Sequence, residues 1–481
     1  MCIQQQHIPK ENRKRILLLS DDMRLNSGVG TASRNFVVGT SHRFNWFQIG
    51  AAVNHPDIGK RVDVSQDINA QLNITDAEVI VQPNHGYGDP DLIRYILNEV
   101  KFDAILHFTD PRQWIWLYNM EHELRQKLPI FFYHVWDNLP YPNYNRNYYL
   151  SCDWIACISK QTENIVRNVC GDELKDEQVS YIPHGINPEE YYPISKEETG
   201  TMREIDNNGV KELESDYKVM NRMKSDLFKD KEYDFIIFYN NRNIRRKNMG
   251  SIVLAYKLFC DKLEPELAKR CLLLMHTDLS DPNGTDLPEV QKNICPDYDI
   301  IFHPQRVPGH IINYLYNMSD VTINLASAEG FGLATAESLM AGTPILATVT
   351  GGMQDQMGFR EKSGLLMKFS KLFGTNSTGK HKKTGDWVFP VFPSAHNLVG
   401  SPPTPYIFDD HVNIDGVVDQ LLEIYNLGNE NRKQRGKHGR EFMLSDESGM
   451  TVAEMSKRFI TEIDKILSTW KSRERYKLFS V

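Results

Sequence analysis

The sequence predicts an α/β protein of two domains, each built on a mostly parallel sheet that helices cover on both faces. In both halves of the chain, short and nearly continuous apolar runs alternate with longer stretches of helical period. A polar, charge-rich segment at about 196–232 separates the two series. The length of 481 residues requires more than one core, because a domain usually holds about 100–200 residues.

The first series of strands and helices occupies residues 1–195. Each expected strand is a short run rich in Ile, Leu, Val and aromatic residues, and each expected helix shows apolar residues every three or four positions. The expected strands are 15–20, 44–49, 78–81, 104–108, 129–135, 154–158 and 179–182. The expected helices include 30–38, 91–100 and 161–169.

The second series occupies residues 233–452, after a linker at 196–232. Its expected strands are 234–239, 272–276, 300–302, 321–325 and 344–347, and its expected helices include 249–263, 309–318 and 334–340. Residues 371–400 are rich in Gly, Ser, Thr, Lys and Pro, so we expect a surface insertion there. A last helix at about 453–481 carries apolar residues at helical spacing and could pack back on the first domain.

Composition and charge narrow the class of protein. A net charge of -8 disfavours a basic nucleic-acid-binding surface that extends over the whole chain. The 7 cysteines are scattered and form no C-x-x-C pair, which fits a reducing compartment better than a disulfide framework. No apolar stretch approaches the ~20 residues of a membrane span, and the first residues contain no apolar signal region. We therefore expect a cytoplasmic protein without a transmembrane segment.

The most specific pattern is EGFGLATAE, which runs from Glu329 to Glu337 between an expected strand and an expected helix. A glycine-rich turn from strand to helix brings backbone N–H groups close to an anion, and the helix N-terminus favours negative charge there. Glu329 follows the carboxyl end of the strand, where ligands bind in open α/β sheets. Glu337 lies early in the helix, within reach of a ribose diol. The alternative is a plain turn followed by an ordinary helix-start acid.

This segment resembles the E-x7-E motif of the retaining GT-B glycosyltransferases, the family of glycogen-synthase-like and sucrose-synthase-like enzymes. The resemblance implies two Rossmann-like domains whose parallel sheets face each other across a cleft. It also implies that Glu329 contacts the transferred sugar and that Glu337 holds the donor ribose. The donor would further contact the residues that follow the first acid, which are Gly330, Phe331, Gly332 and Leu333.

A second pattern, RNIRRK, follows the first expected strand of the second domain and resembles the family's Arg–Lys pair. Arg242 and Lys247 match that pair by spacing. Two fixed cations would stabilise the charge that grows on a leaving nucleoside diphosphate. A solvated basic loop is the alternative, although cations at a helix start oppose the helix dipole unless an anion lies between them. The family's glycine after the lysine is replaced by Asn248.

Weaker patterns extend the resemblance over most of both halves. The glycine turn after the first strand, with Gly28 and Gly30, resembles the family loop that faces the donor phosphates and the acceptor. His134 ends an expected strand where similar family members carry a histidine near the transferred sugar. Asp137 beside it could cap a helix or contact an acceptor. The backbone around Val307 resembles the segment that meets the donor base.

Together these patterns predict an enzyme that transfers a hexose or pentose from a nucleotide sugar to an acceptor hydroxyl, with retention of configuration. We expect no metal and no cofactor besides the nucleotide sugar as co-substrate, since the two cations take the role of a metal. The alternatives are an epimerase or a phosphorylase of the same fold, or a binding homologue without turnover. The acceptor stays open among a glycan, a lipid carrier, a protein, a small molecule and a modified nucleic-acid base.

Overall fold

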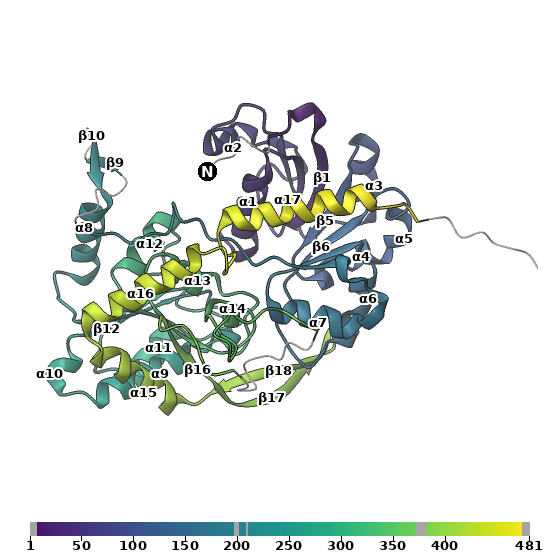
Figure 1. The fold of residues 1–481 in the computed structure, drawn as a ribbon. Coiled ribbons are helices and arrows are strands. Elements are labelled where there is room, and N and C mark those ends of the chain that lie inside the picture. Colours follow the sequence, from purple (N-terminus) through teal and green to yellow (C-terminus); the bar gives the residue numbers. More distant parts are fainter. Residues whose placement is uncertain (1–6, 197–201, 208–209, 372–380, 474–481) are drawn as a thin grey trace, which may run out of the picture.

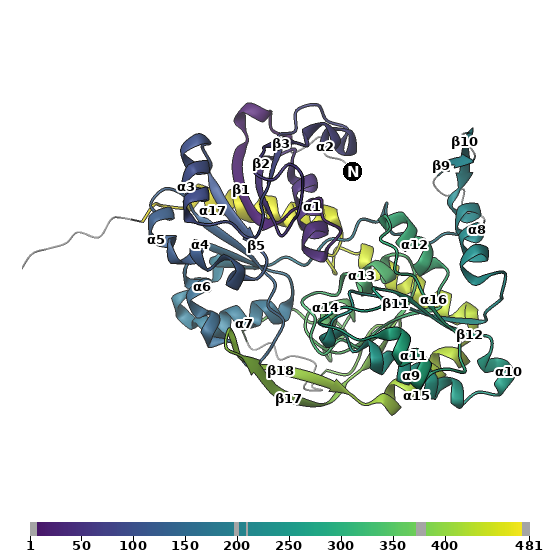
Figure 2. The same ribbon diagram turned by 180° about the vertical axis from the view of Figure 1, so that it is seen from behind.

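The chain folds into two α/β domains that lie side by side (Figures 1 and 2). A computed structural model describes residues 7–196, 202–207, 210–371 and 381–473. Within these residues, no helix is long and apolar enough to cross a membrane. Six cysteines are free and buried, and Cys2 lies outside the described residues.

The first domain is built on an eight-stranded sheet with the order β3-β4-β2-β1-β5-β6-β7-β8. All neighbours in it run parallel except β3 and β4. The strand order reverses at β1, and the carboxyl end of such a strand is where open α/β sheets bind ligands. The strands are β1 (Lys14–Asp21), β2 (Phe44–Ala51), β3 (Val62–Asp63), β4 (Val79–Pro83), β5 (Ala104–Phe108), β6 (Ile130–His134), β7 (Trp154–Cys157) and β8 (Val179–Tyr181).

Helices cover both faces of this sheet, as a continuous apolar strand requires. Along β1, Ile16 and Leu18 belong to one core cluster, whereas Leu17 and Leu19 belong to the other. This alternation is the two-residue period of a strand whose two faces are both buried. The helices are α1 (Gly28–Thr40), α2 (Ser65–Leu72), α3 (Pro90–Glu99), α4 (Ile115–Asn119), α5 (Glu121–Leu124), α6 (Arg146–Leu150) and α7 (Lys160–Cys170).

The second domain is built on a six-stranded parallel sheet with the order β13-β12-β11-β14-β15-β16. Its strands are β11 (Phe235–Asn240), β12 (Cys271–His276), β13 (Ile300–Phe302), β14 (Val321–Asn324), β15 (Ile345–Thr348) and β16 (Val388–Val391). Its helices are α9 (Met249–Asp261), α10 (Pro265–Ala268), α11 (Leu287–Ile294), α12 (Gly309–Asn317), α13 (Leu333–Met340), α14 (Met353–Gln356), α15 (Ile414–Asn426) and α16 (Gly428–Leu444). The order reverses between β11 and β14, and both strands lead into the candidate site.

The predicted α/β class is confirmed, and every predicted strand is present with ends that differ by at most two residues. The segment predicted as a linker holds more structure than expected. It contains an antiparallel hairpin, β9 (Met202–Asn207) and β10 (Val210–Ser215), and the helix α8 (Asp216–Phe228). Residues 197–201 and 208–209 of this segment lie outside the described residues.

The surface insertion predicted at 371–400 is wrong for its second half. Residues 372–380 lie outside the described residues, but Val388–Val391 forms β16, an edge strand of the second sheet. A hairpin follows, made of β17 (Pro393–Ser401) and β18 (Thr404–Val412). The prolines at 390 and 393 make this stretch unlike a strand in the sequence. Pro390 is tolerated because an edge strand needs only one of its two ladders of hydrogen bonds.

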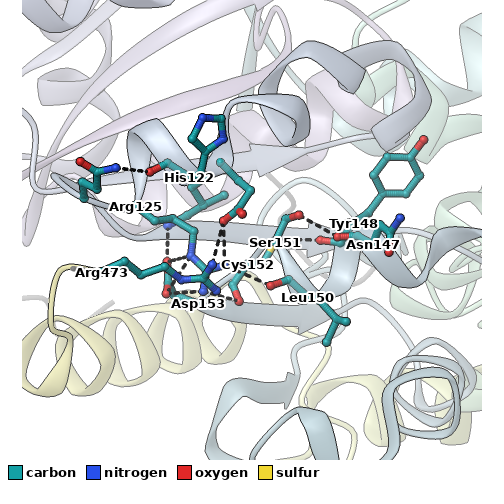
Figure 3. A network of polar contacts seen from close by, with 12 residues as sticks. His122, Arg125, Asn147, Tyr148, Leu150, Ser151, Cys152, Asp153 and Arg473 are labelled. Carbon is teal, nitrogen blue, oxygen red and sulfur yellow. Dashed lines mark hydrogen bonds and ion pairs between the residues drawn. The ribbon is translucent and has the colours of Figure 1, made fainter. Parts of the chain in front are cut away.

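The last helix, α17 (Val452–Thr469), crosses from the second domain back over the first, where it packs on α1 (Figure 1). The ring of Phe459 on this helix lies 5.1 Å from that of Phe36 and 5.0 Å from that of Tyr133. The chain beyond α17 is fastened to the first domain as well. The Arg473 amide donates to the Arg125 carbonyl at 3.0 Å, and Arg125 is a buried residue whose guanidinium pairs with Asp153 at 2.8 Å (Figure 3).

Candidate active site

The candidate site is centred on Glu329, in the loop between β14 and α13. The Lys247 ammonium pairs with the Glu329 carboxylate, and the Arg246 guanidinium lies 3.4 Å from the same oxygen. Both cations come from the short 3-10 turn Arg245–Lys247 that follows β11. The Ser327 amide donates to the Arg246 carbonyl at 2.8 Å and so holds the two loops together. The loops at the carboxyl ends of two adjacent parallel strands thus bring one carboxylate and two cationic side chains together.

Burial and charge act against each other in this cluster. Burial would raise the pKa of Glu329, but Lys247 and Arg246 outweigh it and hold this pKa below its usual value. Burial also lowers the pKa of Lys247, which Glu329 partly offsets. The Lys247 side chain is 6% exposed, whereas Arg246 is 41% exposed. The cluster therefore contains an ionised acid beside two cations, one of which remains open to solvent.

Asn248 explains how this loop does without the family's glycine. Its backbone lies in the left-handed region, with φ 53° and ψ 39°, which asparagine tolerates better than most residues. Its side-chain amide donates to the Leu325 carbonyl at 2.9 Å, at the end of β14. The replacement keeps the turn and adds a hydrogen bond between the two loops that carry Lys247 and Glu329.

Arg242 lies outside this cluster, although its spacing predicts a pair with Lys247. Its guanidinium donates to the Asp281 carboxylate at 3.0 Å, and its side chain is 65% exposed. The reason is local, because the chain turns at Arg245–Lys247 and directs the last two basic residues toward the β14 loop. Arg246 is therefore the residue that joins Lys247, and nothing in the run RNIRRK distinguishes its three arginines beforehand.

Glu337, the second predicted acid, has different partners. It is 9% exposed in α13, and the Tyr316 hydroxyl from α12 donates to it at 2.9 Å. Asn240, the last residue of β11, donates to the same hydroxyl at 2.9 Å. Burial raises the pKa of Glu337 to about 7, an effect that the hydrogen bond from Tyr316 reduces and the charge of Glu190 increases. Glu337 thus lies in a phenol-lined environment, apart from the two cations at Glu329.

Residues of the first domain lie directly against the glycine turn. A Cβ added to Gly330 would lie 3.1 Å from the Val135 carbonyl, which follows β6. The Phe331 ring lies 5.2 Å from that of His184, which follows β8. A Cβ at Gly28, at the start of α1, would lie 3.4 Å from the Leu333 side chain. The structure therefore brings Gly28, Gly330, Phe331 and Leu333 together where the two domains meet.

The two remaining glycines have conformational roles. Gly332 starts α13 with φ 86°, and a Cβ there would lie 2.7 Å from Met353. Gly30 lies in the first turn of α1, where its amide donates to the Ser27 hydroxyl at 3.1 Å. A Cβ at Gly30 would lie 2.5 Å from the Leu25 carbonyl, so only glycine fits there.

Asp137 adds an acid from the first domain. Burial raises its pKa, Arg246 and Lys247 lower it, and Glu329 raises it, so it lies within electrostatic reach of the whole cluster. Its carbonyl accepts a hydrogen bond from Gln161, whose own amide oxygen accepts one from Gln354 of the second domain at 3.0 Å. Sequence reasoning left Asp137 between a cap and an acceptor contact, and missed His184 because its partner Phe331 lies in the other domain.

His134 and Val307 have other partners than the cluster residues. His134 is fully buried at the end of β6, with Nε2 at 2.9 Å from the Tyr149 hydroxyl, and burial lowers its pKa to about 3. Its partners among the described residues belong to the first domain, so it stays a prediction for the reaction. Val307 is half-buried in the loop between β13 and α12, which begins at His303. His303 Nδ1 lies 2.8 Å from His276 Nδ1, which joins the ends of β12 and β13.

The two Rossmann-like domains, each built on a mostly parallel sheet, give the chain the GT-B fold. Residues 220–371 match the family described as "Glycosyl transferases group 1". This segment of the second domain is therefore similar to group 1 glycosyl transferases, in agreement with the resemblance seen in the sequence. A search of curated proteins finds no match to the chain.

Solved structures share the fold over almost the whole chain. Sucrose-phosphate synthase from Thermosynechococcus elongatus is 14% identical, with a TM-score of 0.62, and the match covers 95% of this chain and 100% of that one. Anabaena HepE, solved with UDP and glucose, is 11% identical, with a TM-score of 0.60 and coverage of 94% and 100%. An E. coli protein titled trehalose-6-phosphate, bound with UDP-2-fluoro glucose, is 12% identical, with a TM-score of 0.60 and coverage of 96% and 100%.

Proposed function

We propose that the chain is a retaining glycosyltransferase that uses a nucleoside diphosphate sugar as donor. One observation carries the proposal: Lys247 and Arg246 converge on Glu329 in a strand-to-helix turn that lies against the first domain. Two cations and a helix N-terminus at one point suit an anionic diphosphate, and the acid beside them suits the hydroxyl groups of a sugar.

Donor binding is proposed to change the partners of Lys247. The Lys247 ammonium pairs with the Glu329 carboxylate in the structure. A diphosphate carries more negative charge than one carboxylate, so it competes for Lys247 and for the solvent-accessible Arg246. Glu329 then becomes free to accept hydrogen bonds from the transferred sugar. The site would exchange one ion pair for another, and hydrogen bonds from the sugar hydroxyls would then solvate the Glu329 carboxylate.

In the proposed reaction, the acceptor oxygen attacks C1 of the sugar on the face from which the diphosphate departs. The bond between C1 and the diphosphate oxygen breaks, and its electron pair stays on the diphosphate. The proton of the acceptor hydroxyl passes to a diphosphate oxygen. Lys247 and Arg246 stabilise the leaving group more strongly as its charge grows, which lowers the barrier and takes the role that a metal ion would otherwise have.

The second domain is proposed to hold the nucleoside. Glu337 would accept hydrogen bonds from the ribose, since a carboxylate that Tyr316 already contacts still has free lone pairs. The base would meet the backbone near Val307. UDP sugars are the first donors to test, because the Anabaena and E. coli structures contain UDP or UDP sugars. The acceptor is not assigned, so the tests below measure slow transfer to water.

The cations are tested by three matched substitutions. We expect Lys247→Ala to lower kcat for release of UDP from UDP-glucose on the order of 10²-fold or more, since removal of one preorganised donor has this effect elsewhere. Arg246→Ala should act in the same direction. Arg242→Ala is the matched control, because Arg242 pairs with Asp281. If Arg242→Ala lowered kcat as much as Lys247→Ala, then Arg242 would act with Lys247, as the spacing predicts, in place of Arg246.

Retention and the competing functions are tested on the product. Proton NMR at early times shows which anomer of free glucose appears, and retention requires the α-anomer from an α-linked donor. An epimerase would instead give a new nucleotide sugar, and a phosphorylase would depend on inorganic phosphate. Binding of UDP without turnover of any nucleotide sugar would favour a binding homologue. Unchanged turnover after treatment with a chelator is expected if Lys247 and Arg246 replace a metal.

A further inference from the structure

The hairpin of β17 and β18, residues 393–412, leaves the second domain and reaches the first (Figures 1 and 2). It follows the edge strand β16, runs below α7 in Figure 1, and returns to α15 in the second domain. We name residues 393–412 the strap. Its two strands pair with each other as a sheet of their own and belong to neither large sheet. The contacts of the strap must therefore explain its position.

The outer part of the strap is bound to the first domain through Tyr406. The Tyr144 hydroxyl donates to the Tyr406 carbonyl at 2.8 Å, and the Tyr406 hydroxyl donates to the Tyr141 carbonyl at 3.1 Å. The rings of Tyr144 and Tyr406 meet edge to face at 4.9 Å. Two residues further along, the Phe408 amide donates to the Leu139 carbonyl at 2.6 Å. The strap therefore holds the segment 139–144, which directly follows Asp137.

The root of the strap is bound to the loops around Glu329. Ser327, two residues before Glu329, donates from its hydroxyl to Asp409 at 2.7 Å, and its carbonyl accepts from the Asp410 amide at 3.2 Å. The Thr350 hydroxyl donates to Asp410 at 2.7 Å. Just beyond Thr350, the Gly352 amide donates to the Glu329 carbonyl at 2.8 Å. One pair of acids thus fixes both chain segments that flank the candidate catalytic acid.

We propose that the strap is a positioning element, which ties the first-domain segment 139–144 to the loops that carry Glu329. Tyr406, Asp409 and Asp410 are its positioning residues. They act through the acid of the second domain and the segment of the first, and they do not themselves touch the donor. The strap sets the distance between the two halves of the site, so that Asp137 lies opposite Lys247 and Glu329. The expected effect of the strap on turnover rests on the proposed function, whereas its effect on the distance between the two domains does not.

The experiment compares Tyr406→Ala with Tyr406→Phe in the full chain. Both variants lose the hydroxyl and its bond to the Tyr141 carbonyl, and both keep the bond from the Tyr144 hydroxyl to the main-chain carbonyl of residue 406. The alanine variant also loses the ring contact with Tyr144, which the phenylalanine variant keeps. Leu398→Ala is the matched control, because Leu398 lies on the same hairpin and is 63% exposed. The reference protein has the native strap and carries Cys2→Ser, Tyr95→Cys and Leu267→Cys, so that labels occupy exposed sites on α3 and α10. The three variants carry the same changes.

Three quantities are measured on each protein: the distance between the labels by pulsed electron paramagnetic resonance, the kcat for UDP-glucose cleavage and the Kd of UDP. We expect Tyr406→Ala to lengthen and broaden the distance distribution and to lower kcat for UDP-glucose cleavage by about tenfold or more. The Kd of UDP should stay within about threefold, because the nucleoside is assigned to the second domain alone. Tyr406→Phe should recover most of the kcat and most of the distance distribution.

A distance distribution in Tyr406→Ala that matches the Leu398→Ala control would overturn the proposal, whatever the kcat. A kcat that fails to fall although the distance has lengthened would overturn the positioning role as well. If the reference protein neither binds UDP nor cleaves any nucleotide sugar, the proposed function fails. The distance measurement needs no ligand and would still decide whether the strap holds the two domains in place.

Discussion

At the scale of single residues, Glu337 differs from Glu329 in what surrounds it. Glu329 lies beside two cations, and they hold its pKa below the usual value. Glu337 contacts a phenol and lies near the acid Glu190, and burial raises its pKa to about 7. The first acid is therefore ionised at every pH near neutrality, while the second titrates in the working range. Two carboxylates in one short motif thus have pKa values shifted in opposite directions.

We predict that the affinity for UDP falls as the pH is lowered through about 7. In the proposed function the ionised Glu337 accepts hydrogen bonds from the ribose, and protonation would remove acceptor capacity. If only the ionised form binds well, the Kd should rise by about tenfold between pH 8 and pH 6. Titration calorimetry at several pH values measures this change.

The UDP phosphate also titrates in this range. Glu337→Gln therefore distinguishes the pH dependence that is due to Glu337 from the pH dependence that is due to UDP. The amide has no proton to gain, so the pH dependence that remains in this variant belongs to UDP. The difference between the two proteins should follow a single ionisation near 7. The same pH dependence in both proteins would remove Glu337 from the ribose site.

Asn248 gives a second prediction at this scale. Its left-handed backbone suits Gly as well, whereas Ala would adopt it at a cost of about 1–2 kcal/mol and would lose the hydrogen bond to Leu325. We expect Asn248→Ala to lower the Tm and the turnover, and Asn248→Gly to lie close to the parent in both. Thermal unfolding and UDP-glucose cleavage measure the two effects. A glycine variant as poor as the alanine variant would show that the side-chain amide matters more than the backbone conformation.

At the scale of elements, α17 packs an aromatic side chain into the core of the first domain. Phe459 is 1% exposed, and its ring meets those of Phe36, Tyr133 and Trp154 in the first domain. Phe459→Ala leaves a cavity there and should destabilise the first domain by about 3–5 kcal/mol. Lys465→Ala on the solvent side of the same helix should change the free energy of unfolding by less than about 0.5 kcal/mol. Urea unfolding followed by intrinsic fluorescence compares the two variants.

The elements that sequence predicts well are those whose burial is continuous. A run such as Ile16 to Leu19 is apolar because both faces of its strand are covered, so its position can be read without knowing its neighbours. The strands that were missed obey other rules. Pro390 and Pro393 make β16 and β17 unlike strands in the sequence, because proline is rare inside a sheet. The strands β9 and β10 pair only with each other. Such segments are defined by their partners and their place at an edge, which a local pattern does not contain.

At the scale of the whole molecule, some parts of the site are defined by local sequence and others by contacts between distant segments. The motif from Glu329 to Glu337 and the lysine at 247 could be found because spacing within one loop fixes them. The contacts of Phe331 with His184, and of Gly330 with Val135, join residues of different domains. The pairing of Arg246, and not of Arg242, with Glu329 depends on the direction of one short turn. Information of this kind is contained in tertiary geometry and is lost in a single sequence.

The return of α17 to the first domain also affects how the chain is made. During synthesis the eight strands of the first sheet leave the ribosome early, but the helix that covers Phe36, Tyr133 and Trp154 emerges only after the whole second domain. Until then, the newborn domain has to carry an uncovered aromatic face while more than two hundred further residues are translated. Its maturation therefore waits for the translation of α17, and a product terminated before that helix would expose the aromatic surface to chaperones and proteases.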